Sequence, residues 1–206
     1  MVFKHEKIIA LITIPLLLLS CITTNDDLDK RNIPVELRNG DIAFRRGTGT
    51  ASQAVLYANT RGAYSHVGVV VNINSAWYVV HEVPYEGKTL EDDKIHSEPI
   101  ESFFRPSDSS AGAIYRLESL DSLSQQKVRD YVLYQYGRNI PFDHDYDLSD
   151  SSKMYCSEFV WRSYLEVDID ITKGSRTDLT IPMFRGIKIF PSDIEYNEDL
   201  EPIYRF

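Results

Sequence analysis

The sequence predicts an α+β fold in which an antiparallel sheet, or a small barrel, packs on helices. Residues 64–73 and 76–83 are rich in β-branched and aromatic side chains and are separated by a turn-like segment, which predicts a hairpin. Residues 122–136 and 153–166 instead repeat apolar side chains at the spacing of one helix face. Strands followed along the chain by helices are typical of the α+β class.

The other elements follow from shorter signals. Asp121 or Ser122 is expected to cap the first long helix, which ends near Gly137, and Ser151 or Ser152 to cap the second. Polar residues dominate 88–110, so this stretch is expected to be mostly loop. The remaining expected elements are a strand at 40–44, a short helix at 52–58, a strand at 113–117 and, in an otherwise irregular C-terminal part, a strand at 187–190.

Composition limits the class of protein. The chain has 206 residues, 43% of them hydrophobic, which suits one globular domain behind a leader. Its formal net charge of −9 argues against nucleic acid as a partner, because phosphate binding requires a basic face. No oligomeric state is predicted.

The N-terminus has the pattern of an export signal. Lys4 and Lys7 precede an apolar run at residues 8–19, which is too short to span a membrane comfortably. The sequence LLSC at residues 18–21 resembles a bacterial lipobox, in which Cys21 is acylated and becomes the first mature residue. An uncleaved anchor and an ordinary signal peptide are the alternatives.

These signals divide the chain into three parts. Residues 1–20 are expected to be a lipoprotein signal peptide, residues 21–36 a polar tether, and residues 37–206 the catalytic domain. A lipid on Cys21 would hold the exported protein to a membrane of the bacterial cell envelope. Cys156, the second of the two cysteines, would then lack a disulfide partner.

Cys156 stands at the predicted start of the second long helix. Backbone N–H groups and the dipole at a helix start favour a thiolate, so we expect a lowered pKa and a nucleophilic sulfur. The alternative is a small buried core residue, because free cysteines are often buried.

His66 lies in the first apolar strand and is the expected base for Cys156. Gly68 shares its strand face and leaves room beside it. A third residue would orient the His66 ring. Glu82 suits this role as an acceptor, and His81 could fill it as a neutral tautomer, but adjacent strand residues point to opposite faces, so only one can do so.

Five short motifs together resemble the YiiX/YaeF-like permuted papain-like amidases, a branch of the NlpC-like cysteine peptidase superfamily. They are GDIAF at 40–44, SHVGV at 65–69, YVVHE at 78–82, PFD at 141–143 and YCSEFV at 155–160. The resemblance implies a circularly permuted papain-like fold, in which histidine precedes cysteine. It assigns Cys156 as nucleophile, His66 as base and Glu82 as third residue. Related lipid-acting enzymes have a histidine at the third site, so His81 stays the alternative.

The expected chemistry is attack of Cys156 on a carbonyl, with the oxyanion held by backbone N–H groups at the helix start. Tyr155 is a side-chain candidate for that role, although a packing role is the alternative. No cofactor is expected, and the aspartates and His144 at 143–147 are interpreted as a solvated loop without metal.

Three functions fit these residues. The leading prediction is a cysteine hydrolase that cleaves an amide through a thioester, with cell-wall peptides as the candidate substrate. A lipid acyltransferase or lipid hydrolase with the same pair is the second, and a non-catalytic binding lipoprotein is the third. The expected partners are a small peptide or acyl substrate and the membrane.

Overall fold

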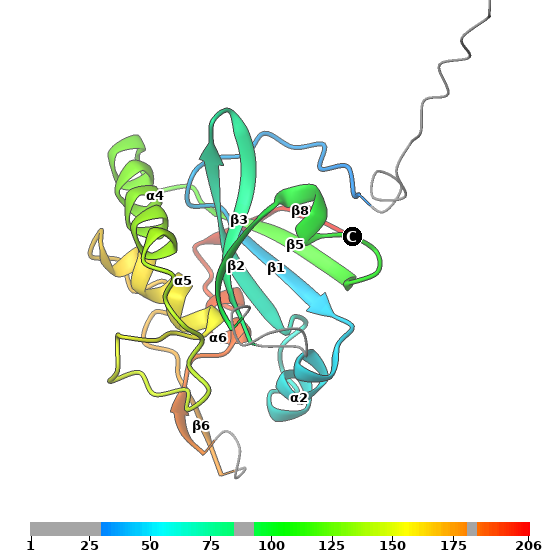
Figure 1. Ribbon diagram of the computed structural model, residues 1–206, viewed down its shortest axis with the longest axis vertical. Helices are drawn as coiled ribbons and strands as arrows, with labels where there is room; N and C mark the ends of the chain where they lie inside the picture. The colour runs from blue at the N-terminus through cyan, green and yellow to red at the C-terminus, as the bar shows by residue number, and fades with distance from the viewer. Residues whose placement is uncertain (1–29, 85–92, 181–184) are drawn as a thin grey trace, which may run out of the picture.

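A central six-stranded antiparallel sheet organises the protein (Figure 1). The computed structural model describes residues 30–84, 93–180 and 185–206. Along the sheet the strands run in the order β4-β3-β2-β1-β5-β8. Their bounds are Ile42–Gly47 for β1, His66–Ile73 for β2, Ala76–Val83 for β3, Lys94–Pro99 for β4, Ser109–Leu117 for β5 and Leu200–Arg205 for β8. The predicted α+β class with an antiparallel sheet is confirmed, and this sheet is open.

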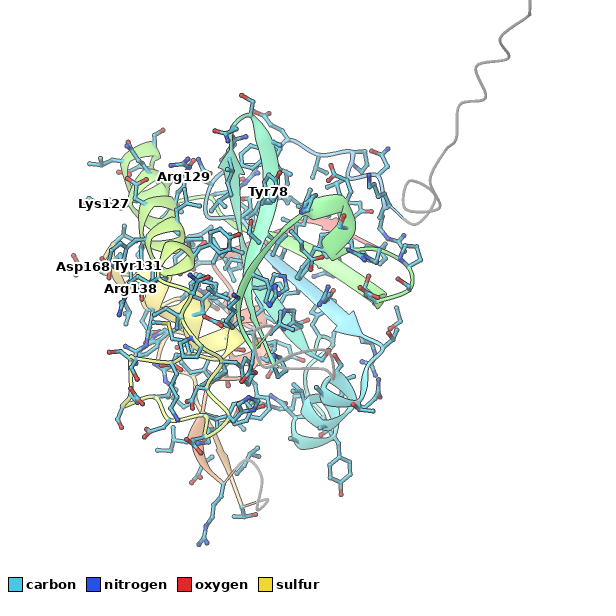
Figure 2. All side chains as sticks on the ribbon, in the orientation of Figure 1. Tyr78, Lys127, Arg129, Tyr131, Arg138 and Asp168 are labelled. Carbon is cyan, nitrogen blue, oxygen red and sulfur yellow. The ribbon has the colours of Figure 1, made fainter. Side chains whose placement is uncertain are left out.

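Two helices cover one face of the sheet, as Figure 1 shows. They are α4 (Ser122–Gly137) and α5 (Cys156–Leu165). Asp121 caps α4 by accepting the Ser124 N–H at 2.8 Å. Arg129 of α4 donates to the Asn72 carbonyl at 2.9 Å and so ties the helix to the β2–β3 hairpin (Figure 2).

The sheet has a hydrophobic core on each face, which explains why β2 is apolar on both. Val67, Val69 and Val71 pack under α4 and α5, whereas Val70 belongs to the second core. That second core includes Phe103 and Phe104 at α3 (Ile100–Phe103). The site described below lies at the start of β2, at one end of this doubly covered sheet.

Two predicted loop regions contain regular structure. Within 88–110, residues from Asp93 onward form β4 and α3, and 88–92 lie outside the described residues. The sequence KIHSEP of β4 does not alternate clearly, because its polar side chains contact other polar groups of the sheet. The prediction of loop was wrong for the described part.

The C-terminal part is also more regular than predicted. It contains β6 (Thr177–Leu179), β7 (Gly186–Lys188), α6 (Pro191–Glu195) and β8. Pro202 lowers the strand signal of β8, but an edge strand tolerates proline. This segment therefore completes the main sheet beside β5.

The N-terminal parts fall partly outside the described residues. Residues 1–20, Cys21 and the tether as far as residue 29 are among those outside. Ile33 and Val35, from the rest of the predicted tether, pack against the second core. Among the described residues, no helix is long and apolar enough to cross a membrane.

Candidate active site

Cys156 is the first residue of α5, as the sequence predicts. Tyr155 precedes it in an extended conformation and provides no side-chain cap, so the predicted Ser151 or Ser152 cap is not formed. The first N–H groups of α5 are therefore available to other acceptors. The sulfur of Cys156 accepts the backbone N–H groups of Val67 and Ser157, which places it beside the start of β2.

The expected low thiol pKa is not found. Burial raises the pKa of Cys156, and the hydrogen bonds to its sulfur only partly oppose this shift. The sequence shows that Cys156 starts a helix, but it does not show that packing buries the thiol. At rest, Cys156 is a neutral thiol that keeps partial exposure.

His66 is the first residue of β2 and is 8% exposed. Its Nε2 lies 2.8 Å from Nδ1 of His81, and the Phe103 ring packs beside both imidazoles. Burial lowers the pKa of His66 well below its usual value, and Arg45 and His81 lower it further. The ring is therefore neutral near pH 7. Since Nε2 is engaged with His81, Nδ1 is the nitrogen left to act as a base.

His81, and not Glu82, contacts His66. The resemblance assigned Glu82, but strand alternation places its side chain on the opposite face of β3 from His81. Gly68 makes room for this arrangement, because a Cβ there would lie 2.8 Å from Cβ of His81. Of the two alternatives for the third residue, the structure brings only His81 to the His66 ring.

Glu82 is buried and differs from His81 in having no polar partner among the described residues. It has no exposed surface, and neither carboxyl oxygen has a hydrogen-bond partner among the described residues. Burial, with the nearby charges of Glu158 and Asp93, raises the pKa of Glu82 to about 10. Glu82 is thus a neutral carboxylic acid at pH 7.

Two charged residues that the sequence analysis missed extend the histidine pair. Glu98 on β4 lies 3.0 Å from Nε2 of His81 and 3.4 Å from Arg45 on β1. Arg45 pairs in register with His66. The signal that could have found Glu98 is the β3–β4 register, which is hidden when residues 88–110 are taken as loop.

Tyr155 packs in the interior, and its hydroxyl accepts the N–H of Ile189 at 2.9 Å. Burial raises the pKa of Tyr155, so the phenol stays protonated. This contact holds the segment before α6 against the start of α5. The groups best placed to stabilise an oxyanion beside the sulfur are the uncapped N–H groups at the start of α5.

Cys156 and His66 line one cleft of about 300 Å³, a volume suited to a small ligand or a peptide end. α2 (Thr50–Ala58) forms one wall with Ala51, Ala54 and Val55. Beside Cys156 a smaller niche is lined mainly by apolar groups. Its lining includes Val55, Tyr155, Ile189, Phe190 and Pro191.

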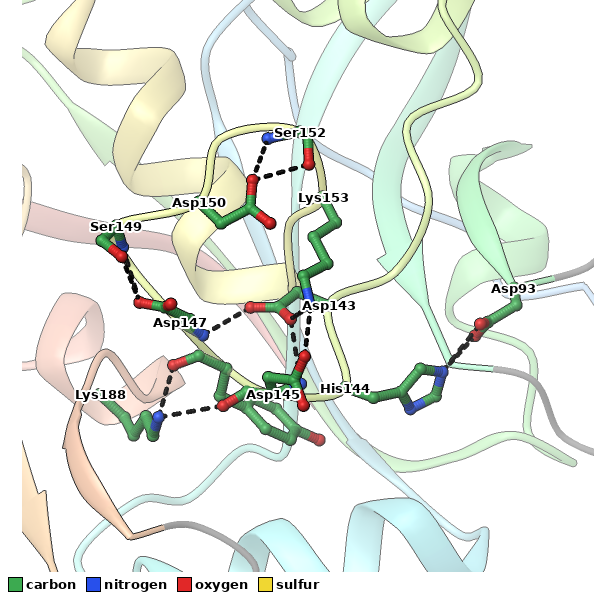
Figure 3. Close-up of polar contacts among 11 residues, drawn as sticks. Asp93, Asp143, His144, Asp145, Asp147, Ser149, Asp150, Ser152, Lys153 and Lys188 are labelled. Atoms are coloured by element: carbon green, nitrogen blue, oxygen red, sulfur yellow. Dashed lines mark hydrogen bonds and ion pairs between the residues drawn. The ribbon is translucent and has the colours of Figure 1, made fainter.

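The acidic loop between α4 and α5 shapes another wall of the cleft (Figure 3). Asp143 has no exposed surface and accepts the Asp145 N–H at 3.0 Å, while Lys153 pairs with it at 3.1 Å. His144 contacts Asp93 at 2.8 Å. These aspartates fix turns of their own loop. Among the described residues, no three His, Cys, Asp or Glu side chains are grouped to hold a metal ion.

A histidine on an early strand and a later cysteine at a helix start, lining one cleft, define the class of permuted papain-like cysteine hydrolases. The family model for the permuted papain-like amidase enzymes, the YaeF/YiiX or C92 family, matches residues 36–181. The chain belongs to this family and is therefore an enzyme of a cysteine amidase class.

A solved structure supports the fold. The chain is similar to a protein described as the metalloprotein yiiX from Escherichia coli O157:H7, with a TM-score of 0.68 and 19% identity. The match covers 84% of this chain and 99% of that one. No curated protein sequence matches the chain significantly.

Proposed function

We propose that the protein cleaves amide bonds in cell-wall peptides, with Cys156 as nucleophile and His66 as base. The observation that carries this proposal is the ring pairing of His66 with His81. It engages one nitrogen of a neutral imidazole and leaves the other to act as a base, and His66 lines the same cleft as Cys156. A neutral imidazole is the form that can accept a proton.

The reaction would proceed through a thioester. His66 removes the thiol proton as the sulfur attacks the carbonyl carbon, and the oxyanion faces the N–H groups at the start of α5. The His66 imidazolium then protonates the departing amine. A water molecule, deprotonated by His66, attacks the thioester, releases the carboxylic acid and restores the thiol.

Product analysis tests this reaction. Purified protein is incubated with peptidoglycan fragments, and mass spectrometry is used to find products that gain one water at an amide. We expect Cys156→Ala to abolish the products, and acid-quenched protein to carry an acyl group on Cys156. Glu118→Gln is the control, since Glu118 pairs with Arg38 and is not among the residues that line the cleft. Products that persist in Cys156→Ala would rule out this nucleophile.

A lipid substrate is the second candidate, and two observations favour it. The lining of the niche beside Cys156 is apolar, as contact with an acyl group requires, and the residue that contacts His66 is a histidine, as in related lipid-acting enzymes. Incubation with acyl lipids separates the candidates. Release or transfer of a fatty acyl group that depends on Cys156, without cleavage of peptide fragments, would select the lipid reaction.

We also propose that the protein works at the cell envelope, anchored through a lipid on Cys21. The support is the lipobox-like sequence at residues 18–21 and the polar residues that follow it. Fractionation of cells should recover the protein with membranes, and Cys21→Ala should move it out of that fraction. Equal recovery of both proteins with membranes would contradict the anchor.

A further inference from the structure

Glu98 is brought to His81 by the register of two neighbouring strands. His81 pairs with His96, and Val79 pairs with Glu98, across the antiparallel β3–β4 ladder. Side chains of paired residues, and of residues two positions along, share one face of a sheet. Glu98 is therefore the diagonal neighbour of His81 on the face that also carries the His66 contact.

Polar contacts hold the Glu98 carboxylate in place. Its Oε1 lies 3.0 Å from Nε2 of His81, and its two oxygens lie 3.4 Å from Arg45 and Arg105 respectively. Arg45 is itself fixed, because it donates to the Phe103 carbonyl at 3.0 Å and its guanidinium lies over the Phe103 ring. The carboxylate is thus held by two arginines as well as by its contact with His81.

Glu98 is ionised. Burial alone would raise its pKa, but the close contact with His81 and the charges of Arg45 and Arg105 outweigh burial and lower the pKa. An ionised carboxylate only accepts hydrogen bonds. The ring nitrogen of His81 that faces it must therefore carry a proton.

That requirement fixes the tautomers of both rings. Burial lowers the pKa of His81 despite the opposing effect of Glu98, so the ring is neutral and a proton on Nε2 leaves Nδ1 as an acceptor. The His66 nitrogen at 2.8 Å from this acceptor must then be the donor. His66, which lines the cleft, consequently carries its proton on Nε2 and keeps the lone pair of Nδ1 as its basic site.

We infer that Glu98 is a positioning residue that acts through His81 to hold His66 in the tautomer able to deprotonate Cys156. The inference deepens the proposed function and rests on it. The chain of contacts runs from a fixed carboxylate through one imidazole to the next, so Glu98 needs no contact with substrate. When His66 becomes charged during the reaction, the same chain keeps its Nε2 proton directed at His81.

Nuclear magnetic resonance of the full chain, labelled with ¹⁵N at the histidine rings, tests the inference directly. Long-range ¹H–¹⁵N correlations distinguish the two tautomers of each ring, and single His→Gln variants assign the signals. We expect His66 and His81 of the wild type to be protonated on Nε2 near pH 7. In Glu98→Gln, whose amide can also donate, we expect mixed or reversed tautomers at both rings.

The rate at which iodoacetamide alkylates Cys156 provides the second readout. We expect Glu98→Gln to slow alkylation by about 10- to 100-fold, the loss seen when the partner that orients a metal-binding histidine is removed. Glu118→Gln is the matched control, because its carboxylate pairs with Arg38 and should leave tautomers and rate unchanged.

The outcomes separate the inference from the proposed function. A wild-type His66 protonated on Nδ1 would overturn the inference, and this spectrum does not depend on any variant folding. Wild-type tautomers and rate in Glu98→Gln would also overturn it. If the tautomers and the Glu98→Gln effects are as expected but no amide is cleaved, the positioning role stands and the proposed function fails.

Discussion

His81 and Glu82 are adjacent residues of β3, but their side chains lie on opposite faces of the sheet and have different surroundings. His81 lies 2.8 Å from His66 through Nδ1 and 3.0 Å from the Glu98 carboxylate through Nε2, although the Nε2 contact lacks hydrogen-bond geometry. Glu82, the next residue, is buried with no hydrogen-bond partner for its carboxyl among the described residues. Position in a motif therefore does not decide which residue joins the site, because strand alternation sends adjacent side chains to different surroundings.

The largest effect expected on the histidine face comes from His66→Ala. Cys156 is a neutral thiol at rest, so its reaction depends on a base that removes the proton. We expect alkylation of Cys156 by iodoacetamide near pH 7 to slow by about 10²- to 10⁴-fold, the usual contribution of a general base.

Alkylation as a function of pH refines this test. The rates of His66→Ala and wild type should converge at high pH, where solvent ionises the thiol without help. Glu118→Gln should match wild type throughout. An unchanged alkylation rate in His66→Ala at neutral pH would mean that His66 is not the base that deprotonates Cys156.

On the other face, Glu82 should make stability depend on pH. Below its usual pKa of 4.5 the carboxyl is protonated in both folded and unfolded chains, so it has no effect there. As the pH rises towards about 10, only the unfolded chain releases the proton. The free energy of unfolding should then fall by up to about 1.4 kcal/mol per pH unit from this group.

Glu82→Gln removes that titration and keeps the size of the side chain. Urea unfolding at about pH 5.5 and pH 7.5 should show the variant gaining stability relative to wild type at the higher pH. Glu158, whose pKa burial raises to about 7, remains in the variant, so some pH dependence should persist. Identical pH dependence in the two proteins would mean that Glu82 is ionised in the folded state.

Gly68→Ala should have a smaller effect, and it should lower both the stability of the fold and the rate of Cys156 alkylation. A Cβ at this position would lie 2.6 Å from Cγ1 of Val79 and 2.8 Å from the Val80 carbonyl oxygen and Cβ of His81. We expect a loss of about 1–3 kcal/mol in the free energy of unfolding and slower alkylation, because the strand must shift under His81. Gly137→Ala is the control, since its Cβ would meet no atom within 4 Å.

The elements with strong local signals could be predicted from the sequence. The β2–β3 hairpin, the Asp121 cap of α4 and the start of α5 all follow from periodicity or turn chemistry. β4 and β8 could not be predicted, because polar residues or proline hide their strand character. Their places depend on pairing with strands distant in the chain, which local propensity does not contain.

The residues of the site also divide into those that local motifs predict and those that depend on strand pairing. Cys156 and His66 could be proposed from motifs, whereas the choice between His81 and Glu82 depends on which face of β3 meets His66. Glu98 depends on the pairing of β3 with β4. The thiol pKa was misjudged for a related reason, because burial is a property of the packed chain and outweighs the helix start.

The central claim is that His81, and not Glu82, is the ionisable residue of β3 that acts on His66, and a pair of variants tests it most directly. His81→Gln and Glu82→Gln are compared for alkylation of Cys156 at pH 7. We predict a slowing of about 10- to 100-fold for His81→Gln and a rate near wild type for Glu82→Gln. The reverse pattern, in which Glu82→Gln is slow and His81→Gln is normal, would contradict the account.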